Sequence, residues 1–185
     1  MKNQKTANTT EKKVANKGRK NESKEIIIIG DSIVKDIKAR DLSESNNIKI
    51  RKHSGASTLD MIDHIKPEAR NKPDLLLIHS GTNDFTKGVN TMKKVKKVVN
   101  AIKEIDKDEE IKICFSSIIF RDDQNFHEDI KKINSKLKSF CEGIGLYFLD
   151  NENIDGLCLN RGRLHLNRKG TSMMKKNISN FINSI

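Results

Sequence analysis

The chain has 185 residues and a mass of 21.0 kDa, which is room for one domain of ordinary size. Lys and Arg outnumber Asp and Glu by 36 to 25, and the apolar residues cluster in short runs that exclude a wholly disordered protein. No apolar stretch reaches the roughly 18 residues that span a bilayer, and the N-terminal residues lack the apolar segment of a signal peptide. The three cysteines have no CxxC spacing, which argues against a disulfide framework or a zinc ribbon. We therefore expect a cytoplasmic protein.

The first 24 residues differ from the rest of the chain in composition. They carry eight Lys or Arg against two Glu, a net charge of +6 out of the formal +11, and almost no apolar residue. This composition predicts a disordered basic tail over residues 1–24, followed by one domain over residues 25–185 with a net charge of +5. The tail is either a solubilising extension or a contact for nucleic acid or another acidic partner.

From Glu25 onward, short apolar runs alternate with stretches of helical period, and there is no internal repeat. The predicted strands, each rich in Ile, Leu or aromatic residues, are 26–29, 48–52, 75–79, 111–117 and 146–149. The predicted helices are 33–39, 58–65, 91–105, 126–140 and a last one after Asn167, whose side chain suits an N-cap.

This alternation indicates the fold class. Parallel strands joined by right-handed crossovers place helices on both faces of a sheet, so we predict a three-layer α/β/α sandwich with five parallel strands in the order 2-1-3-4-5. In such sheets the ligand lies beyond the carboxyl ends of the strands, near the switch point of the strand order. The residues that follow the strands are therefore the candidates for chemistry.

Polar residues follow the predicted strands at four places. Ser32 comes directly after the first strand, in Gly30-Asp31-Ser32, where a backbone N–H cluster and the positive end of a helix would meet. Gly55 follows the second strand and can turn a bare N–H toward the same crevice. Asn83 follows the third strand, within Gly81-Thr82-Asn83-Asp84, and offers an amide donor; His165 precedes the last helix.

Each of these groups alone has an ordinary explanation, such as a turn glycine, a capping serine or a packed histidine. Their joint occurrence at the strand ends is harder to obtain by accident. A serine, two oxyanion donors and a histidine are what nucleophilic acyl transfer requires.

These blocks resemble those of the SGNH, or GDSL-type, hydrolase superfamily, and the resemblance covers residues 25–185. It implies a flavodoxin-like sandwich and makes Ser32 the nucleophile, with His165 as the general base. It also implies an oxyanion hole formed by the N–H groups of Ser32 and Gly55 and by the amide of Asn83. Asp31 and Asp84 would be supporting residues of the matched blocks.

One position departs from the pattern of that family. An Asp usually precedes the catalytic histidine by three residues and orients it, whereas Gly162 occupies this position here. A backbone carbonyl could hold the ring of His165, or Asp150 or Asp155 could reach in from the preceding loop. Alternatively, catalysis has been lost.

Other motifs predict no cofactor and no metal. There is no GxxxxGK[ST] and no GxGxxG after a strand, which argues against nucleotide cofactors. Asp60, Asp63 and His64 share a predicted helix, but a solvated helix face explains them more simply than a metal site. Two further expectations concern the surface. On the predicted helix 91–105, four lysines are expected on the exposed side: Lys93, Lys94, Lys96 and Lys97. Two loops, 85–89 and 120–126, are expected to line the substrate pocket.

The sequence therefore predicts a serine esterase that acts on a small ester or thioester through an acyl-Ser32 intermediate. The alternative is a catalytically impaired binding module of the same fold, tied to nucleic acid through the basic tail. The predicted partner is a small acyl-ester substrate, and the sequence does not indicate the oligomeric state.

Overall fold

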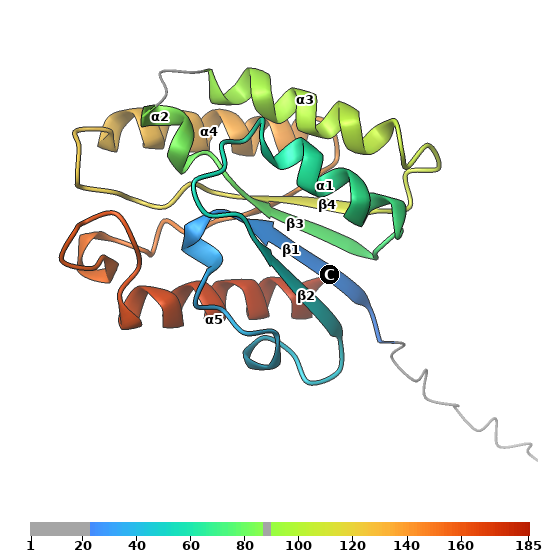
Figure 1. Cartoon of the computed structure of the whole chain (residues 1–185), viewed down its shortest axis with the longest axis horizontal. Helices are drawn as coiled ribbons and strands as arrows, with labels where there is room; N and C mark the ends of the chain where they lie inside the picture. The colour runs from blue at the N-terminus through green and yellow to red at the C-terminus, as the bar shows by residue number, and fades with distance from the viewer. Residues whose placement is uncertain (1–22, 87–89) are drawn as a thin grey trace, which may run out of the picture.

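The computed structural model describes residues 23–86 and 90–185, and these residues contain a five-stranded parallel sheet (Figure 1). The strand order is β2-β1-β3-β4-β5, which confirms the predicted topology. The predicted tail falls almost wholly outside the described residues. The strands are β1 (Glu25–Gly30), β2 (Asn47–Lys52), β3 (Leu75–His79), β4 (Lys112–Ser116) and β5 (Tyr147–Leu149).

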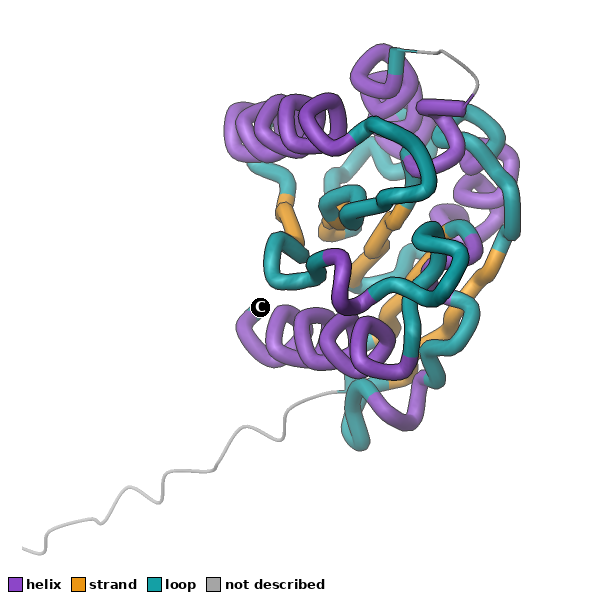
Figure 2. The backbone as a smooth tube through the Cα atoms, turned by 90° about the vertical axis from the view of Figure 1, so that its left-hand side faces the viewer, coloured by secondary structure: helices purple, strands orange, loops and turns teal. Residues whose placement is uncertain are grey.

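Helices cover both faces of the sheet, as Figures 1 and 2 show from two directions. Three of the longer helices lie on one face, and the last helix lies on the other. Two separate apolar cores result, one on each side of the sheet. The helices are α1 (Met61–Arg70), α2 (Thr82–Thr86), α3 (Thr91–Lys103), α4 (His127–Gly143) and α5 (Arg168–Ser184).

Strand β1 lies in the interior of the sheet, between β2 and β3, and its four isoleucines are apolar toward both faces. Ile26 and Ile28 pack into the core beneath α5, whereas Ile27 and Ile29 pack beneath α1 and α3, and all four are fully buried. Burial of one such side chain contributes about 1.5–3 kcal/mol, so this run strongly favours an interior position. The carboxyl end of β1 thus lies between the ends of β2 and β3.

Backbone hydrogen bonds continue past the strand ends and draw the following segments together. The N–H of His53 donates to the carbonyl of Gly30 at 2.8 Å, and the N–H of Asp31 donates to the carbonyl of His79 at 3.3 Å. The turns that follow β1, β2 and β3 therefore meet at one edge of the sheet, as predicted for a site in this fold.

The prediction of a helix over residues 33–39 is wrong. The chain forms two 3₁₀ turns there, Ser32–Val34 and Ala39–Asp41. Ile33, Val34 and Ile37 have helical spacing and are buried, but they fill the core already covered by α5, so short turns suffice to bury them. The helix predicted over residues 58–65 begins and ends later than expected: the observed helix α1 starts at Met61 and ends at Arg70.

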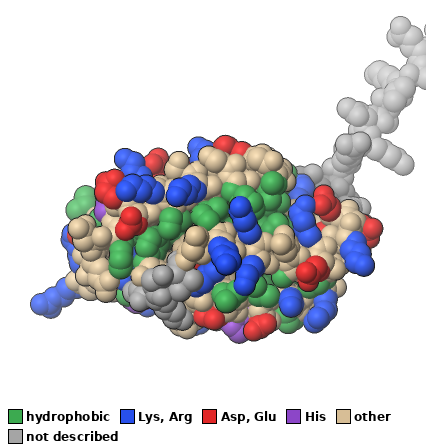
Figure 3. All heavy atoms as spheres, turned by 90° about the horizontal axis from the view of Figure 1, so that it is seen from above, with side chains coloured by type: hydrophobic (Ala, Val, Ile, Leu, Met, Phe, Trp, Pro, Cys, Tyr) green, Lys and Arg blue, Asp and Glu red, His purple; other side chains and the backbone are tan. Residues whose placement is uncertain are grey.

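The prediction of four exposed lysines on α3 is wrong at Lys94. Lys93, Lys96 and Lys97 are exposed, but Lys94 is buried beside Val95 and Val98. The outer surface of this helical layer mixes basic, acidic and apolar side chains (Figure 3).

The three cysteines are free and buried, and burial raises the pKa of the Cys114 thiol well above its ordinary value. In the described ranges, no helix is both long and apolar enough to cross a membrane.

Candidate functional site

The segment after β1 presents a serine above a buried carboxylate. Asp31 is fully buried and caps the following 3₁₀ turn, because its Oδ1 accepts a hydrogen bond from the N–H of Ile33 at 2.9 Å. This cap fixes the backbone on both sides of Ser32, whose side chain is only partly buried. The hydroxyl is thereby held at the surface of a rigid turn.

The hydroxyl of Ser32 meets a ring nitrogen of His165, 133 residues further along the chain. The distance from Ser32 Oγ to His165 Nδ1 is 3.4 Å, and the tautomer of the ring decides which atom donates. This separation is long for a hydrogen bond, but the contacts of catalytic groups are commonly loose without a bound substrate. The structure thus brings together the two residues that the sequence singled out as nucleophile and base.

The two predicted oxyanion donors lie on segments that are bonded to each other. Gly55 has φ of +78° in an exposed turn, a conformation that L side chains rarely adopt. Asn83 donates from Nδ2 to the carbonyl of Ala56 at 3.0 Å. This contact joins the turn after β2 to helix α2, which replaces the loop predicted around Asn83.

Gly81, at the start of the same block, is required by close packing. Its φ is +119°, and a Cβ at this position would lie 2.5 Å from Cδ1 of Ile118. Real Cβ atoms do not approach other atoms this closely, so only glycine fits without movement of the neighbouring chain.

Asp84, the residue after Asn83, connects helix α2 to the segment after β2 and to helix α3. Its Oδ1 accepts the N–H of Thr58 at 3.1 Å and Nζ of Lys94 at 2.8 Å, and both charged side chains are buried. The hydroxyl of Thr58 also donates to Oγ of Ser80 at 3.2 Å. Lys94 lies one helical turn from both Thr91 and Val98, which are buried, and this spacing is the signal that could have identified it.

His165 lies on a hairpin between β5 and α5. Leu159 and Leu166 form an antiparallel bridge, and the N–H of Asn160 donates to the carbonyl of His165 at 2.7 Å. In return, the N–H of His165 donates to Oδ1 of Asn160 at 3.4 Å. Asn167 caps α5 through the N–H of Gly170, as predicted, and its amide also donates to two carbonyls of the hairpin.

The structure gives His165 no carboxylate at the position of Gly162. Asp150 and Asp155, the two predicted substitutes, accept hydrogen bonds from backbone N–H groups of their own loop, those of Glu152 and Leu157. Within residues 23–86 and 90–185, neither a carboxylate nor a carbonyl oxygen is hydrogen-bonded to the ring of His165. Among the described residues, Ser32 and His165 therefore form a dyad.

His79 lies at the end of β3, where its carbonyl accepts the N–H of Asp31, the residue before Ser32. Its Nδ1 is 3.0 Å from Oγ of Ser116, and the ring is completely buried. Burial lowers the pKa of His79, while the charge of Asp31 opposes this effect. The sequence placed His79 at a strand end, but it gave no sign that the ring is shielded from water.

His53 and His64 stack face to face, with ring centroids 3.6 Å apart. Burial, followed by the charge of His64, lowers the pKa of His53. Asp60 accepts hydrogen bonds from the backbone and the hydroxyl of Ser57. Among the described side chains, no group of three or more His, Cys, Asp or Glu is arranged to hold a metal ion.

The two loops expected to line the substrate pocket are only partly described, because residues 87–89 lie outside the described residues. The rings of Phe85 and Phe126 are in contact, with centroids 5.4 Å apart. Phe120 lines a cavity of about 540 Å³ between α4 and the segment after β5, and neither Ser32 nor His165 is part of its lining. The predicted role of these loops in substrate binding stays a prediction.

Comparisons with known proteins agree with the fold. A family model described as GDSL-like lipase/acylhydrolase matches residues 28–172. No significant match was found among curated proteins.

Three solved structures illustrate the similarity of fold. A GDSL-like lipase from Bacteroides thetaiotaomicron has a TM-score of 0.69 at 17% identity, covering 87% of this chain and 88% of its own. A member of the lipolytic G-D-S-L family from Veillonella parvula gives 0.68 at 19% identity, covering 87% and 99%. A carbohydrate esterase of family 3 from Talaromyces cellulolyticus gives 0.71 at 17% identity, covering 87% and 97%.

Proposed function

Because the chain belongs to the GDSL-like lipase/acylhydrolase family, we propose that it is a serine esterase that hydrolyses small esters or thioesters. The observation that carries this proposal is the 3.4 Å approach of Ser32 Oγ to His165 Nδ1. A serine hydroxyl is a weak nucleophile at neutral pH unless a base lies within reach of its proton. His165 is that base.

The reaction proceeds in two steps that use the same pair of residues. Ser32 Oγ attacks the carbonyl carbon of the ester while its proton passes to His165, and the leaving alcohol or thiol takes that proton as the bond to the acyl group breaks. Water then attacks the acyl-Ser32 ester, again losing a proton to His165. The acid is released and the Ser32 hydroxyl is restored.

The negative oxygen of each tetrahedral intermediate needs preorganised donors. In this proposal the donors are the backbone N–H groups of Ser32 and Gly55 and the side-chain amide of Asn83. Support comes from the left-handed conformation of Gly55 and from the hydrogen bond between Asn83 and Ala56. This bond holds helix α2 next to the turn after β2. The Asp84–Lys94 pair beneath them keeps these segments together.

The proposal is tested by labelling the purified full chain with a fluorophosphonate probe and by measuring hydrolysis of p-nitrophenyl acetate. Ser32→Ala should abolish labelling, and His165→Ala should lower the hydrolysis rate by about 10²- to 10⁴-fold, the usual contribution of a general base. Ser54→Ala, in the exposed turn beside Gly55, is the matched control and should label normally. Acetylated sugars form the first substrate screen, because a structural neighbour is a carbohydrate esterase.

The second candidate function is a binding module that keeps the fold without turnover. Gly162 favours it, because His165 then lacks the usual carboxylate. A folded wild-type protein that neither labels nor hydrolyses the ester would support this function and contradict the esterase. Labelling that persists in Ser32→Ala would contradict the assignment of the nucleophile.

A further inference from the structure

The cavity of about 540 Å³ between α4 and the segment after β5 is not part of the Ser32–His165 site. Its lining contains neither of these two residues, and it contains neither Gly55 nor Asn83. The volume lies within the range of about 300–1,000 Å³ that is usual for small-molecule sites in proteins. Such sites combine an apolar floor with a few polar groups that orient the ligand, and this cavity has both parts.

The floor of the cavity is apolar. Ile118, Ile130 and Ile154 line it, and each is at most 4% exposed. The partly buried rings of Phe120 and Phe148 line it as well. An apolar group that enters the cavity would exchange water for contacts with these side chains, and this exchange favours binding.

Both walls of the cavity are fixed by hydrogen bonds. On α4, Asn134 donates from Nδ2 to the carbonyl of Ile118 at 2.8 Å, and its Oδ1 accepts the N–H of Ile118 at 2.9 Å. After β5, the N–H of Asn151 donates to Oγ of Ser117 at 2.8 Å, and its Nδ2 donates to Oγ of Ser116 at 2.8 Å. The cavity is therefore preformed, and binding would require little ordering of the protein.

The rim carries opposite charges on its two sides. Lys131 and Lys138 are exposed and lie two helical turns apart on α4. Asp150, Glu152 and Asp155 are exposed on the opposite side, in the segment after β5. In the part of the chain that the structure describes, no ion pair joins the two sides. Both sides therefore have charge left to contact a ligand.

We propose that this cavity binds a small zwitterion with an apolar body, such as a dipeptide with apolar side chains. The carboxylate would face the lysines of α4, the ammonium group would face the carboxylates after β5, and the side chains would lie on the isoleucine floor. A ligand with a single charge would meet a like charge on one side of the rim, so the rim selects a molecule that carries both charges. This binding site does not depend on Ser32 being an active nucleophile.

The test is an NMR titration of the full chain, with isotope-labelled isoleucine methyl groups, by the dipeptide leucyl-phenylalanine. The methyl signals of Ile118, Ile130 and Ile154 should shift and saturate with a Kd of about 1 mM or lower. The signals of Ile27 and Ile29, in the core beneath α1 and α3, should not move. A titration in which the three floor signals do not saturate, or do not shift, would overturn the proposal.

Two capped forms of the dipeptide test the recognition of charge. N-acetyl-leucyl-phenylalanine lacks the ammonium group, and leucyl-phenylalanine amide lacks the carboxylate. Each should bind about two- to fivefold more weakly than the zwitterion, which is the effect expected from loss of one exposed ion pair. Equal affinity of all three molecules would mean that apolar burial alone accounts for binding, and it would contradict the choice of a zwitterion.

A substitution that fills the cavity tests its location. Ser135 is exposed on α4 and lines the cavity, whereas Ser139 is exposed one turn further along and does not. Ser135→Phe should weaken binding of the dipeptide at least tenfold, and Ser139→Phe should leave it unchanged. Unchanged affinity in a folded Ser135→Phe variant, as judged by circular dichroism, would place the dipeptide elsewhere.

A pair of surface substitutions keeps the test decisive if Ser135→Phe does not fold. Lys131→Gln with Lys138→Gln removes the positive side of the rim and should weaken the dipeptide about fivefold, but it should leave the affinity for the dipeptide amide unchanged. Lys132→Gln with Lys136→Gln, two exposed lysines of α4 outside the lining, makes the same change in net charge and should have no effect. Equal losses for the dipeptide and its amide would contradict the role of the lysines as partners of the carboxylate.

Discussion

The two halves of the dyad are held by different kinds of structure. Ser32 follows a fully buried interior strand of the sheet, and three polar side chains at the ends of β1 and β3, Asp31, His79 and Asp84, are completely shielded from water. His165 stands on a hairpin whose Arg161, Gly162 and Arg163 are exposed. The proposed nucleophile is therefore fixed by the core of the protein, whereas the proposed base is fixed by a few backbone hydrogen bonds and by a neighbouring loop.

This difference explains why the segments around Ser32 keep the residues that are usual in the family, whereas the hairpin of His165 has Gly162 in place of the usual Asp. A change near Ser32 disturbs buried charges and close packing, so it costs stability as well as activity. A change in the hairpin leaves the fold intact, so the position of Gly162 can lose its carboxylate without unfolding the chain. The three predictions that follow test this contrast.

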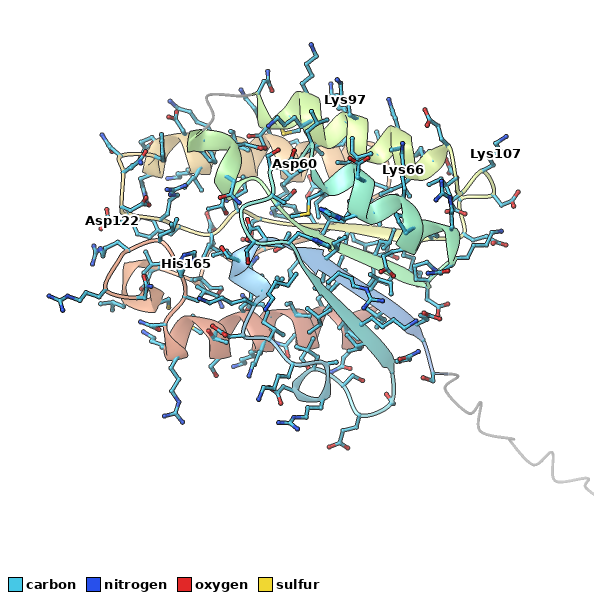
Figure 4. All side chains as sticks on the ribbon, in the orientation of Figure 1. Asp60, Lys66, Lys97, Lys107, Asp122 and His165 are labelled. Carbon is cyan, nitrogen blue, oxygen red and sulfur yellow. The ribbon has the colours of Figure 1, made fainter. Side chains whose placement is uncertain are left out.

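The largest effect is expected on the Ser32 side, from Lys94→Met. This variant leaves the carboxylate of Asp84 buried without its charge partner, and the free energy of unfolding should fall by about 3–5 kcal/mol. Urea denaturation followed by circular dichroism measures the change. Lys97→Met on the exposed side of α3, where Figure 4 shows the side chain pointing outward, is the matched control. Equal stability of the two variants would contradict a buried, energetically important pair.

An intermediate effect is expected from His79. The pKa of the buried ring is below its ordinary value, so the unfolded chain takes up a proton below about pH 6.5 that the folded chain takes up only at lower pH. The free energy of unfolding should accordingly be constant above that pH. It should fall as the pH drops from 6.5 to 5.5, by up to about 1.4 kcal/mol per pH unit for each such histidine. His53 contributes with the same sign.

Urea denaturation of His79→Asn at pH 7.5, 6.5 and 5.5 tests this assignment. The slope of stability against pH should become shallower than in the wild type, with part of it remaining because of His53. The exposed His127→Asn should keep the wild-type slope. An unchanged slope in His79→Asn would mean that the shielded ring does not govern acid sensitivity.

The smallest effect on stability is expected on the hairpin, from Asn160→Ala. Its side chain accepts one long hydrogen bond from the N–H of His165, so stability should change by less than about 1 kcal/mol. Activity toward p-nitrophenyl acetate should nevertheless fall several-fold, because the backbone that carries His165 loses one of its hydrogen bonds. Arg161→Ala, on the same exposed turn, should leave both quantities unchanged. A large loss of stability in Asn160→Ala would remove the contrast between the two halves.

The strands and the site blocks were predictable because local patterns specify them. Four consecutive β-branched isoleucines followed by a glycine favour a short strand buried on both faces, and the Gly30-Asp31-Ser32 turn follows directly from that strand. The pairing of Ser32 with His165 was predictable only as a family pattern, because the two residues lie 133 positions apart. Their 3.4 Å approach depends on the packing of α5 and on the hairpin before it.

Two features could not be predicted for physical reasons. The prediction of a helix over residues 33–39 was wrong because the spacing of its apolar residues is also compatible with short turns beneath α5. Lys94 was misplaced because a buried lysine needs a carboxylate partner, and the sequence does not show that Asp84 lies beside it.

The interior position of β1 also has a consequence for biosynthesis. Among the five strands of the sheet, β1 is synthesised before its partners β2 and β3, and its isoleucines are covered on one side only when α5 has been made. During synthesis, the run Ile26–Ile29 is therefore an exposed, strongly β-forming segment of the kind that self-associates. The charged residues Lys24, Glu25 and Asp31 flank this run, and as gatekeepers they would keep nascent chains apart until the last helix closes over it.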